Sequence, residues 1–208
     1  MDQRTIVERF CDHCGWAWTI RNQYRILYEC SEDRCRLLET AARDFFGFMR
    51  EVLADYIYLQ FGRLTDAPSS GRVANLTAPY IANELEWPPE VRDVLRKHLK
   101  ILLAFRKKVI LPRHKLIAHA DLEACLQEST LGSFPEGEDN RFFESLQEFV
   151  NVAHDCAVGG PYPLDAVSLA DADTLVKCLR RGVAFESLWA DHTTLADQLL
   201  TDSEYADA

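Results

Sequence analysis

Apolar residues recur at steps of three and four along most of this 208-residue chain, and no alternation of apolar with polar side chains stands out. Steps of three and four place side chains on one face of an α-helix, whereas a half-buried strand requires a step of two. The pattern predicts an all-α fold, a helical bundle in which each helix buries one apolar stripe. With 48% hydrophobic residues, the chain can fill one core, so we expect a single domain over residues 1–190 and an acidic tail over residues 191–208.

The same spacing predicts helices over residues 5–28, 32–64, 89–111 and 171–188, a further helix after Asp139 and a short one that ends near Glu86. Residues expected to face inward from the helix over 89–111 and from the helix after Asp139 are Val91, Leu95, Leu99, Leu102, Phe105, Val109, Phe142, Leu146, Phe149, Val150 and Ala153. Pro112 disfavours helical geometry at Leu111, so we expect one helix to end or kink there and the next to begin near Pro112.

In the segment 32–64, Gly47 is the only weak point of an otherwise regular helical pattern. An unbroken helix over this segment turns one set of side chains inward. That set is Leu38, Ala42, Phe45, Met49, Val52, Tyr56 and Leu59.

The charge of the chain is unevenly distributed. A formal net charge of -10 argues against a protein that coats nucleic acid through its overall field. Between Val94 and Ala120, however, there is no acidic residue, and the basic residues there are Arg96, Lys97, Lys100, Arg106, Lys107, Lys108, Arg113 and Lys115. This basic stripe is either a solvated helix face or a local anion-binding surface, and the charge pattern alone does not separate the two.

Features of secreted and membrane proteins are missing from the sequence. No window reaches the roughly 18 to 20 uninterrupted apolar residues of a membrane helix. The first residues, Asp2, Gln3 and Arg4, do not start a basic stretch followed by an apolar run. The seven cysteines are an odd number spread over the whole chain, which argues against a disulfide scaffold. We therefore expect a cytoplasmic protein with reduced cysteines and no membrane partner.

Four of the cysteines come near the spacing of two zinc knuckles: Cys11 and Cys14, followed by Cys30 and Cys35. The second pair is separated by four residues rather than two. The residues between the pairs have helical spacing, which would hold the pairs apart. We therefore favour buried helix cysteines over a metal site, and we expect no metal and no cofactor.

The segment that begins at Arg113 carries the clearest chemical signal. If a helix begins near Pro112, then Arg113, His114 and Lys115 lie at its positive end, where a cation is disfavoured by roughly 0.3 to 1 kcal/mol. Three cations in that position suggest an anion nearby. Free backbone amides and a guanidinium together suit phosphate oxygens, although Arg113 and His119 can equally pair with surface carboxylates.

The string Arg113-His114-Lys115-Leu116-Ile117-Ala118-His119 resembles the signature of HEPN domains, which is an arginine, four to six residues and a histidine, with a polar residue after the arginine. The resemblance extends to the AbiU-like branch, named for abortive-infection proteins of bacterial phage defence. Segments 37–46, 61–66 and 75–77 are similar to the long helix and the following loop of that branch. The similarity runs over roughly residues 20–126, and the later residues match only in being helical.

The resemblance implies a four-helix, up-and-down core with additional N- and C-terminal helices, usually dimerised so that two copies of the motif face one cleft. Many HEPN proteins are metal-independent endoribonucleases that cut single-stranded or looped RNA. On this interpretation His119 is the acid or base, because an unperturbed histidine pKa of about 6.5 suits proton transfer at cellular pH. Arg113 would neutralise charge on the phosphoryl oxygens, and His114 would orient a phosphate or carry a second proton.

The resemblance also implies RNA as a partner, with the remaining basic residues as counter-charges to its backbone. Lys115, Arg106, Lys107 and Lys108 are the expected contacts. Phage defence or a toxin–antitoxin pair is the implied setting, with an antitoxin or defence protein as a further partner and a 2′,3′-cyclic phosphate as the product. The alternative is a non-catalytic helical dimer that binds a nucleotide or a partner protein, because some proteins of this fold lack activity.

Overall fold

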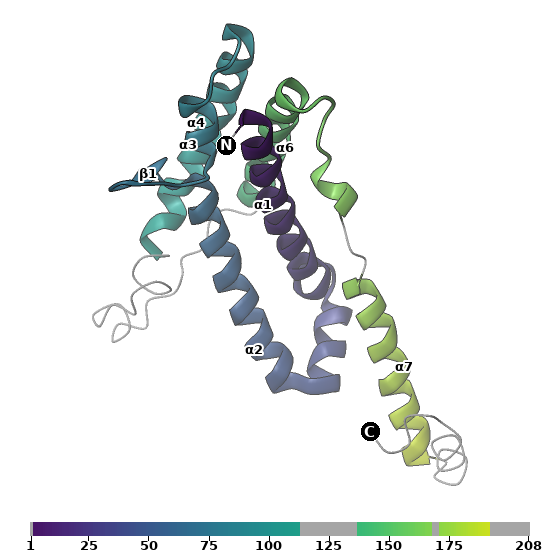
Figure 1. Cartoon of the computed structure of the whole chain (residues 1–208). Helices are drawn as coiled ribbons and strands as arrows, with labels where there is room; N and C mark the ends of the chain where they lie inside the picture. Colours follow the sequence, from purple (N-terminus) through teal and green to yellow (C-terminus); the bar gives the residue numbers. More distant parts are fainter. Residues whose placement is uncertain (1, 113–136, 168–170, 192–208) are drawn as a thin grey trace. The chain divides into compact units, whose positions relative to one another are not determined.

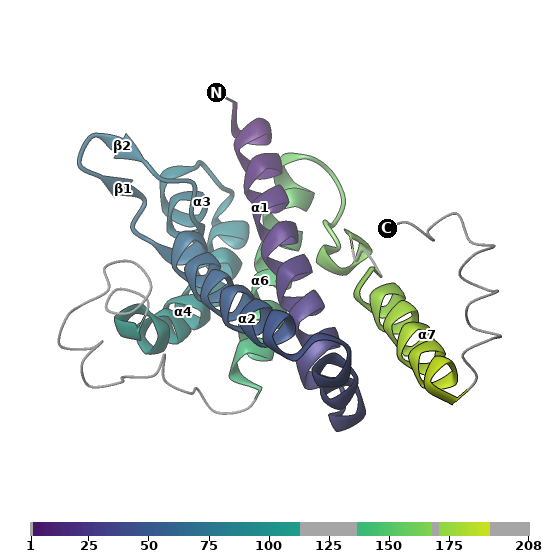
Figure 2. The ribbon, with the colours of Figure 1, turned by 90° about the horizontal axis from the view of Figure 1, so that it is seen from below.

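The computed structural model describes residues 2–112, 137–167 and 171–191 (Figures 1 and 2). Its α-helices are α1 Gln3–Tyr24, α2 Glu32–Thr65, α3 Ala78–Glu84, α4 Pro89–Pro112, α6 Glu138–Ala157 and α7 Asp171–Asp191. A π-helical turn, η1 Arg25–Glu29, follows α1, and a 3-10 turn, η3 Leu164–Val167, follows α6. Two strands of two residues each, β1 Ser69–Ser70 and β2 Val73–Ala74, pair antiparallel. The predicted all-α class is confirmed, and within these ranges no helix has the length and apolar content needed to cross a bilayer.

The chain divides into two compact units. Unit 1 comprises Met1–Asn22 and Leu53–Ser168, and unit 2 comprises Gln23–Val52 and Leu169–Ala208. Each unit has buried apolar residues of its own. The single domain over residues 1–190 stays a prediction, and most of the predicted tail lies outside the described residues.

Residue pairs across the helices show how unit 1 is built. Phe10 of α1 contacts Phe149 of α6, with ring centroids 5.9 Å apart, and Trp18 contacts Phe143 at 5.4 Å. Higher numbers on α1 thus meet lower numbers on α6, so the two helices are antiparallel. Figure 1 shows the part of α2 that belongs to unit 1 running antiparallel to α1.

The pairing of α4 with α6 follows the same reversed order. Nδ1 of His98 on α4 lies 3.1 Å from Oγ of Ser145 on α6. Ten residues later along α4, Lys108 forms an ion pair with Glu138 at the start of α6. The helices α1, α2, α4 and α6 therefore form an up-and-down four-helix bundle.

Phe61 of α2 lies at the centre of this bundle and is 1% exposed. Its ring centroid is 4.9 Å from that of Phe105 on α4, 4.9 Å from that of Phe142 on α6 and 5.7 Å from that of Phe143. Aromatic pairs in tilted and edge-to-face geometry add about 0.5–1.5 kcal/mol beyond the burial of their surface. The predicted inward faces are confirmed except at Val91, which is only half-buried. The residues buried here include Leu95, Leu99, Leu102, Phe105, Val109, Phe142, Leu146, Phe149, Val150 and Ala153.

A buried ion pair joins α1 to the first turn of α6. Arg21 is 8% exposed and Asp139 is 7% exposed, and the Arg21 guanidinium donates through Nε and Nη2 to Oδ2 of Asp139. The helix α6 begins after Gly137, whose φ of 82° is in the region that favours glycine. Two acidic residues, Glu138 and Asp139, then occupy the first turn, where the helix dipole favours negative charge.

The side chains predicted to face inward from α2 are partly wrong, because the helix turns a different face inward after Ala42. Ala42 has φ -166° and ψ 78°, so the helix is kinked there, whereas Gly47 is helical. After the kink the buried aromatic residue is Phe46, at 7% exposed, and Phe45 is 58% exposed. Val52, which was also expected to face inward, is 41% exposed. A single non-helical residue rotates the apolar stripe, and residue spacing alone does not reveal it.

The predicted helix over residues 89–111 is confirmed as α4, which ends one residue later than expected, at Pro112. Leu111 and Pro112 both belong to α4. Proline lacks the N–H that would bond to the carbonyl four residues earlier, and because α4 ends at Pro112, this loss is confined to its last turn. Whether a new helix begins at Pro112 lies outside the described residues.

Unit 2 contains η1, the first part of α2 and α7. Its buried core consists of Leu27, Leu38, Phe46, Ala172 and Val176. Polar contacts hold the start of α7 within this unit: Arg34 forms an ion pair with Asp173 at 2.8 Å, and the amide of Ala172 donates to Oε1 of Gln23 at 3.0 Å. The predicted helix over residues 171–188 is confirmed as α7.

We predict that the Arg21–Asp139 pair is required for the stability of unit 1. Replacing Arg21 by methionine leaves the Asp139 carboxylate buried without its counter-charge, which costs about 3–5 kcal/mol. Urea denaturation followed by circular dichroism measures the change in unfolding free energy. Arg9→Met is the matched control, because Arg9 is on the same helix and its pair with Asp12 is largely exposed. Equal losses in the two variants would contradict the prediction.

Candidate functional site at the end of α4

The helix α4 carries the basic stripe from Arg96 to Lys108, and much of this part is free of counter-charge. Arg96, Lys97, Lys100 and Lys107 are exposed. None of the four forms an ion pair within the described part of the chain. These charges therefore remain available to an external anion.

Arg106 is held differently, because its guanidinium donates to Oδ1 of Asp66 at 2.9 Å. Both side chains are 29% exposed. Asp66 directly follows α2, so the pair fixes the last turns of α4 against the end of α2. The sequence prediction treated Arg106 as a free counter-charge to RNA, and the structure gives it a carboxylate partner.

Lys108 also has a partner, since it forms an ion pair with Glu138 in the first turn of α6. The end of α4 and the start of α6 are therefore joined. The predicted motif lies in the sequence between these two joined ends. Its residues Arg113, His114, Lys115 and His119 are outside the described residues, and their roles stay predictions.

A groove of about 320 Å³ lies between α4 and α6. Three cations, Lys100, Lys108 and Arg141, line it together with apolar residues that include Ile101 and Phe142. Arg141 is exposed and forms no ion pair in the described ranges, so the positive surface of α4 continues onto α6. Arg141 does not stand out in the sequence, because it follows two acidic residues and lies far from the stripe along the chain. Cations beside apolar surface suit a flexible anionic chain that carries flat rings.

His98, which follows Lys97 on α4, faces the core side of this helix. Its Nδ1 lies 3.1 Å from Oγ of Ser145 on α6. Burial lowers the pKa of His98 below 6.5, the positive charge of Lys97 lowers it further, and Glu148 opposes the shift. His98 therefore favours its neutral form and adds no charge to the basic stripe at neutral pH.

The cysteines that suggested a zinc knuckle are in unfavourable surroundings for a thiolate. Cys11 and Cys14 are both 0% exposed, on α1. Burial raises the pKa of Cys11 to about 12 and raises that of Cys14 well above 9.0. Metal ligation requires the thiolate, so burial works against it at these two positions. Within the residues that the structure describes, no three histidine, cysteine or carboxylate side chains are placed to share a metal ion.

An up-and-down helical bundle whose basic helix leads into an arginine–histidine motif is the class of domain called HEPN. The family model HEPN_AbiU2, described as AbiU2, matches residues 3–176, and this chain belongs to that family. The match begins earlier and ends later than the resemblance over roughly residues 20–126, and it includes α1, α6 and the start of α7. No curated protein and no solved structure matches the chain.

We predict that His98 makes the protein less stable as the pH falls. Its folded pKa is below the unfolded value of about 6.5, so between these two values the unfolded chain binds more protons and the unfolding free energy decreases as the pH is lowered. An NMR titration of the His98 ring should show a midpoint below 6.5. In His98→Gln, which keeps a hydrogen-bonding group beside Ser145, the unfolding free energy should depend less on pH in this window. A midpoint at or above 6.5 would contradict the prediction.

The cysteines should separate into two classes by reactivity. Cys30, Cys156 and Cys178 are exposed, whereas Cys11 and Cys14 are buried and their thiols resist ionisation. Iodoacetamide at mildly alkaline pH should alkylate the exposed group in the native protein and should reach the buried pair only after unfolding. Mass spectrometry of the peptides measures each site. If Cys11 were alkylated as fast as Cys30, the burial of the Cys11 thiol would be contradicted.

Proposed function

We propose that this protein is a metal-independent endoribonuclease of the HEPN type, acting in phage defence or as one component of a toxin–antitoxin pair. One observation carries the proposal: in a member of the HEPN_AbiU2 family, the Arg113–His119 motif follows directly on a basic helix. An abortive-infection role fits the family to which the chain belongs.

The proposed chemistry uses the 2′-hydroxyl of the RNA as the nucleophile. Its oxygen attacks the adjacent phosphorus and its proton passes to a histidine, for which His119 is the candidate. The bond from phosphorus to the 5′-oxygen breaks, and that oxygen takes up a proton, with His114 as a candidate donor. Arg113 stabilises the charge that grows on the phosphoryl oxygens. The products are a 2′,3′-cyclic phosphate and a free 5′-hydroxyl.

The RNA strand would follow the free cations of α4 and the groove between α4 and α6. Lys100, Lys107 and Arg141 are the best candidates for phosphate contacts, because none has a carboxylate partner in the described residues. Arg106 and Lys108 would contribute less, since Asp66 and Glu138 already compensate them. The apolar part of the groove would accept bases of single-stranded or looped RNA. Lys115 stays among the predicted contacts.

A homodimer is part of the proposal. Two copies of the motif would share one cleft, and an antitoxin or another defence protein would bind the assembly. Light scattering at micromolar concentration tests the dimer, and a monomeric mass would count against the shared cleft.

A second function is favoured by the net charge of -10. An acidic protein repels nucleic acid outside its basic stripe, and this suits a non-catalytic dimer that binds a nucleotide or a partner protein. Growth on expression separates the two functions. Growth arrest that disappears in His119→Ala supports the nuclease, whereas equal tolerance of both forms supports the non-catalytic protein.

The direct test is cleavage of a single-stranded RNA by the purified protein in the presence of EDTA. The wild type should cut RNA and leave the matching DNA intact, because DNA lacks the 2′-hydroxyl. Arg113→Ala and His119→Ala should each abolish cleavage with little change in Tm. Lys107→Ala should weaken cleavage and reduce its dependence on salt. Arg72→Ala is the control, since Arg72 is an exposed arginine of unit 1 that is not part of the basic stripe.

Two outcomes would overturn the assignment. If Arg113→Ala and His119→Ala both unfold, the two residues are structural and the nuclease proposal fails. If cleavage requires a divalent ion, the proposed mechanism is wrong even where the class of enzyme stands.

A further inference from the structure

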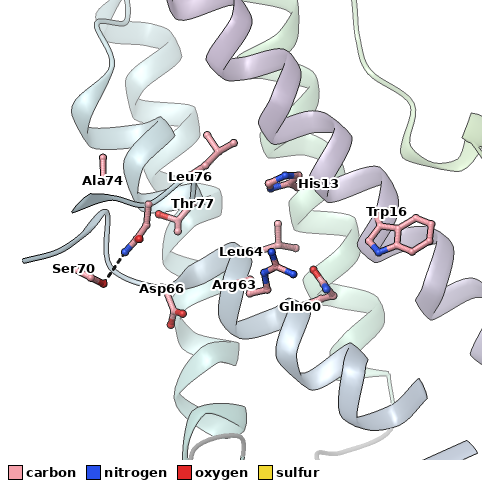
Figure 3. A pocket seen from close by; sticks show the side chains of 11 residues that line it. His13, Trp16, Gln60, Arg63, Leu64, Asp66, Ser70, Ala74, Leu76 and Thr77 are labelled. Atoms are coloured by element: carbon pink, nitrogen blue, oxygen red, sulfur yellow. Dashed lines mark hydrogen bonds between the residues drawn. The ribbon is translucent and has the colours of Figure 1, made fainter. Parts of the chain in front are cut away.

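A second polar site lies in unit 1, where α1, the end of α2 and the chain from Asp66 to Thr77 surround a pocket of about 490 Å³. Figure 3 shows His13 and Trp16 on the α1 wall and Gln60 and Arg63 on the α2 wall. Ser70 and Thr77 belong to the wall that the hairpin and the start of α3 form. This volume is within the range of pockets that hold small organic ligands.

The pocket favours an anion. Arg63 is exposed to it and forms no ion pair within the described residues. The carboxylate in the wall, Asp66, is already compensated by Arg106 at 2.9 Å. The available charge in the pocket is therefore positive, and a guanidinium binds a phosphate group in bidentate fashion.

The pocket also offers an aromatic surface. Trp16 is 51% exposed, which is unusual for so large an apolar side chain. Its indole Nε1 donates to the hydroxyl of Tyr56 at 2.9 Å, and this bond limits rotation of the ring. An exposed indole in a fixed orientation is a stacking surface for a flat ring such as a nucleobase.

Gln60 gives independent support for a ligand. Its side chain lines the pocket and the residue is 6% exposed, yet its Nε2 has no hydrogen-bond partner within the described residues. A buried donor without an acceptor destabilises the fold, so such groups are rare unless they serve a purpose. The terminal torsion of glutamine is soft, and rotation about it presents either amide atom to a ligand.

From these groups we infer that the pocket binds a phosphorylated nucleoside. The phosphate pairs with Arg63 and His13, the base stacks on Trp16, and the Gln60 amide completes its hydrogen bonding with a polar atom of the ligand. The ligand is either a free mononucleotide or one nucleotide of an RNA strand, and these share the same chemistry. The inference is independent of the nuclease proposal, because none of these side chains belongs to the arginine–histidine motif.

Calorimetry on the full chain tests the site with AMP, adenosine, ribose 5-phosphate and inorganic phosphate. AMP should bind at least about tenfold more tightly than each of the three partial ligands. Arg63→Gln should reduce the affinity for AMP to that for adenosine. Trp16→Leu should reduce it to that for ribose 5-phosphate, while Trp16→Phe should retain most of it. Arg72→Gln is the matched control and should bind as the wild type does, since Arg72 is not among the residues that line the pocket.

Gln60→Met separates binding from folding. It removes the buried unpaired amide, so the Tm should rise by about 2–4 °C while the affinity for AMP falls. Loss of both stability and affinity would show that Gln60 is structural and would remove its part in the site.

A short oligoribonucleotide distinguishes the two sources of the nucleotide, measured on the His119→Ala protein so that no strand is cut. Tighter binding of the oligonucleotide than of AMP, lost in Arg63→Gln, assigns the pocket to an RNA strand. Comparable binding assigns it to a free nucleotide. The inference is overturned if Arg63→Gln and Arg72→Gln bind AMP equally, or if neither AMP nor the oligonucleotide binds at millimolar concentration.

Discussion

The structure of unit 1 depends on the ion pair between Arg21 and Asp139. Two charged side chains that are both buried are tolerated only together, so the pair sets the register in which α1 meets α6. Asp139 is adjacent to Glu138, which pairs with Lys108 of α4. The first turn of α6 is thereby attached to α1 on one side and to α4 on the other. The end of α4, from which the arginine–histidine motif continues, takes its position from these two contacts.

The fold could be predicted from the sequence wherever a helix is regular. In α4 and α6, buried residues such as Leu102 and Leu146 follow steps of three and four without interruption. The prediction failed at Ala42, because a non-helical residue inside α2 changes which of Phe45 and Phe46 is buried. Arg21 and Asp139 are 118 residues apart, and local spacing contains no information about such a pair.

The site was predicted to a smaller extent, because composition locates charges but not their partners. The basic stripe was evident from the sequence, yet Arg106 and Lys108 have carboxylate partners 40 and 30 residues away along the chain. Lys107, between them, is exposed and has none in the described residues. Arg141 extends the positive surface from another helix and has acidic neighbours in sequence. Adjacent cations of one helix therefore serve either the attachment of α4 to its neighbours or an external anion.

The pairing of α1 with α6 has a consequence for how the protein is made. Ribosomes synthesise the chain from its N-terminus, so Phe10 emerges long before Phe149, against which it packs. Until α6 has been translated, the apolar faces of α1 and α2 and the charge of Arg21 lack their partners. Unit 1 is therefore expected to close late in synthesis, and nascent chains that end before Glu138 expose an apolar surface that chaperones recognise.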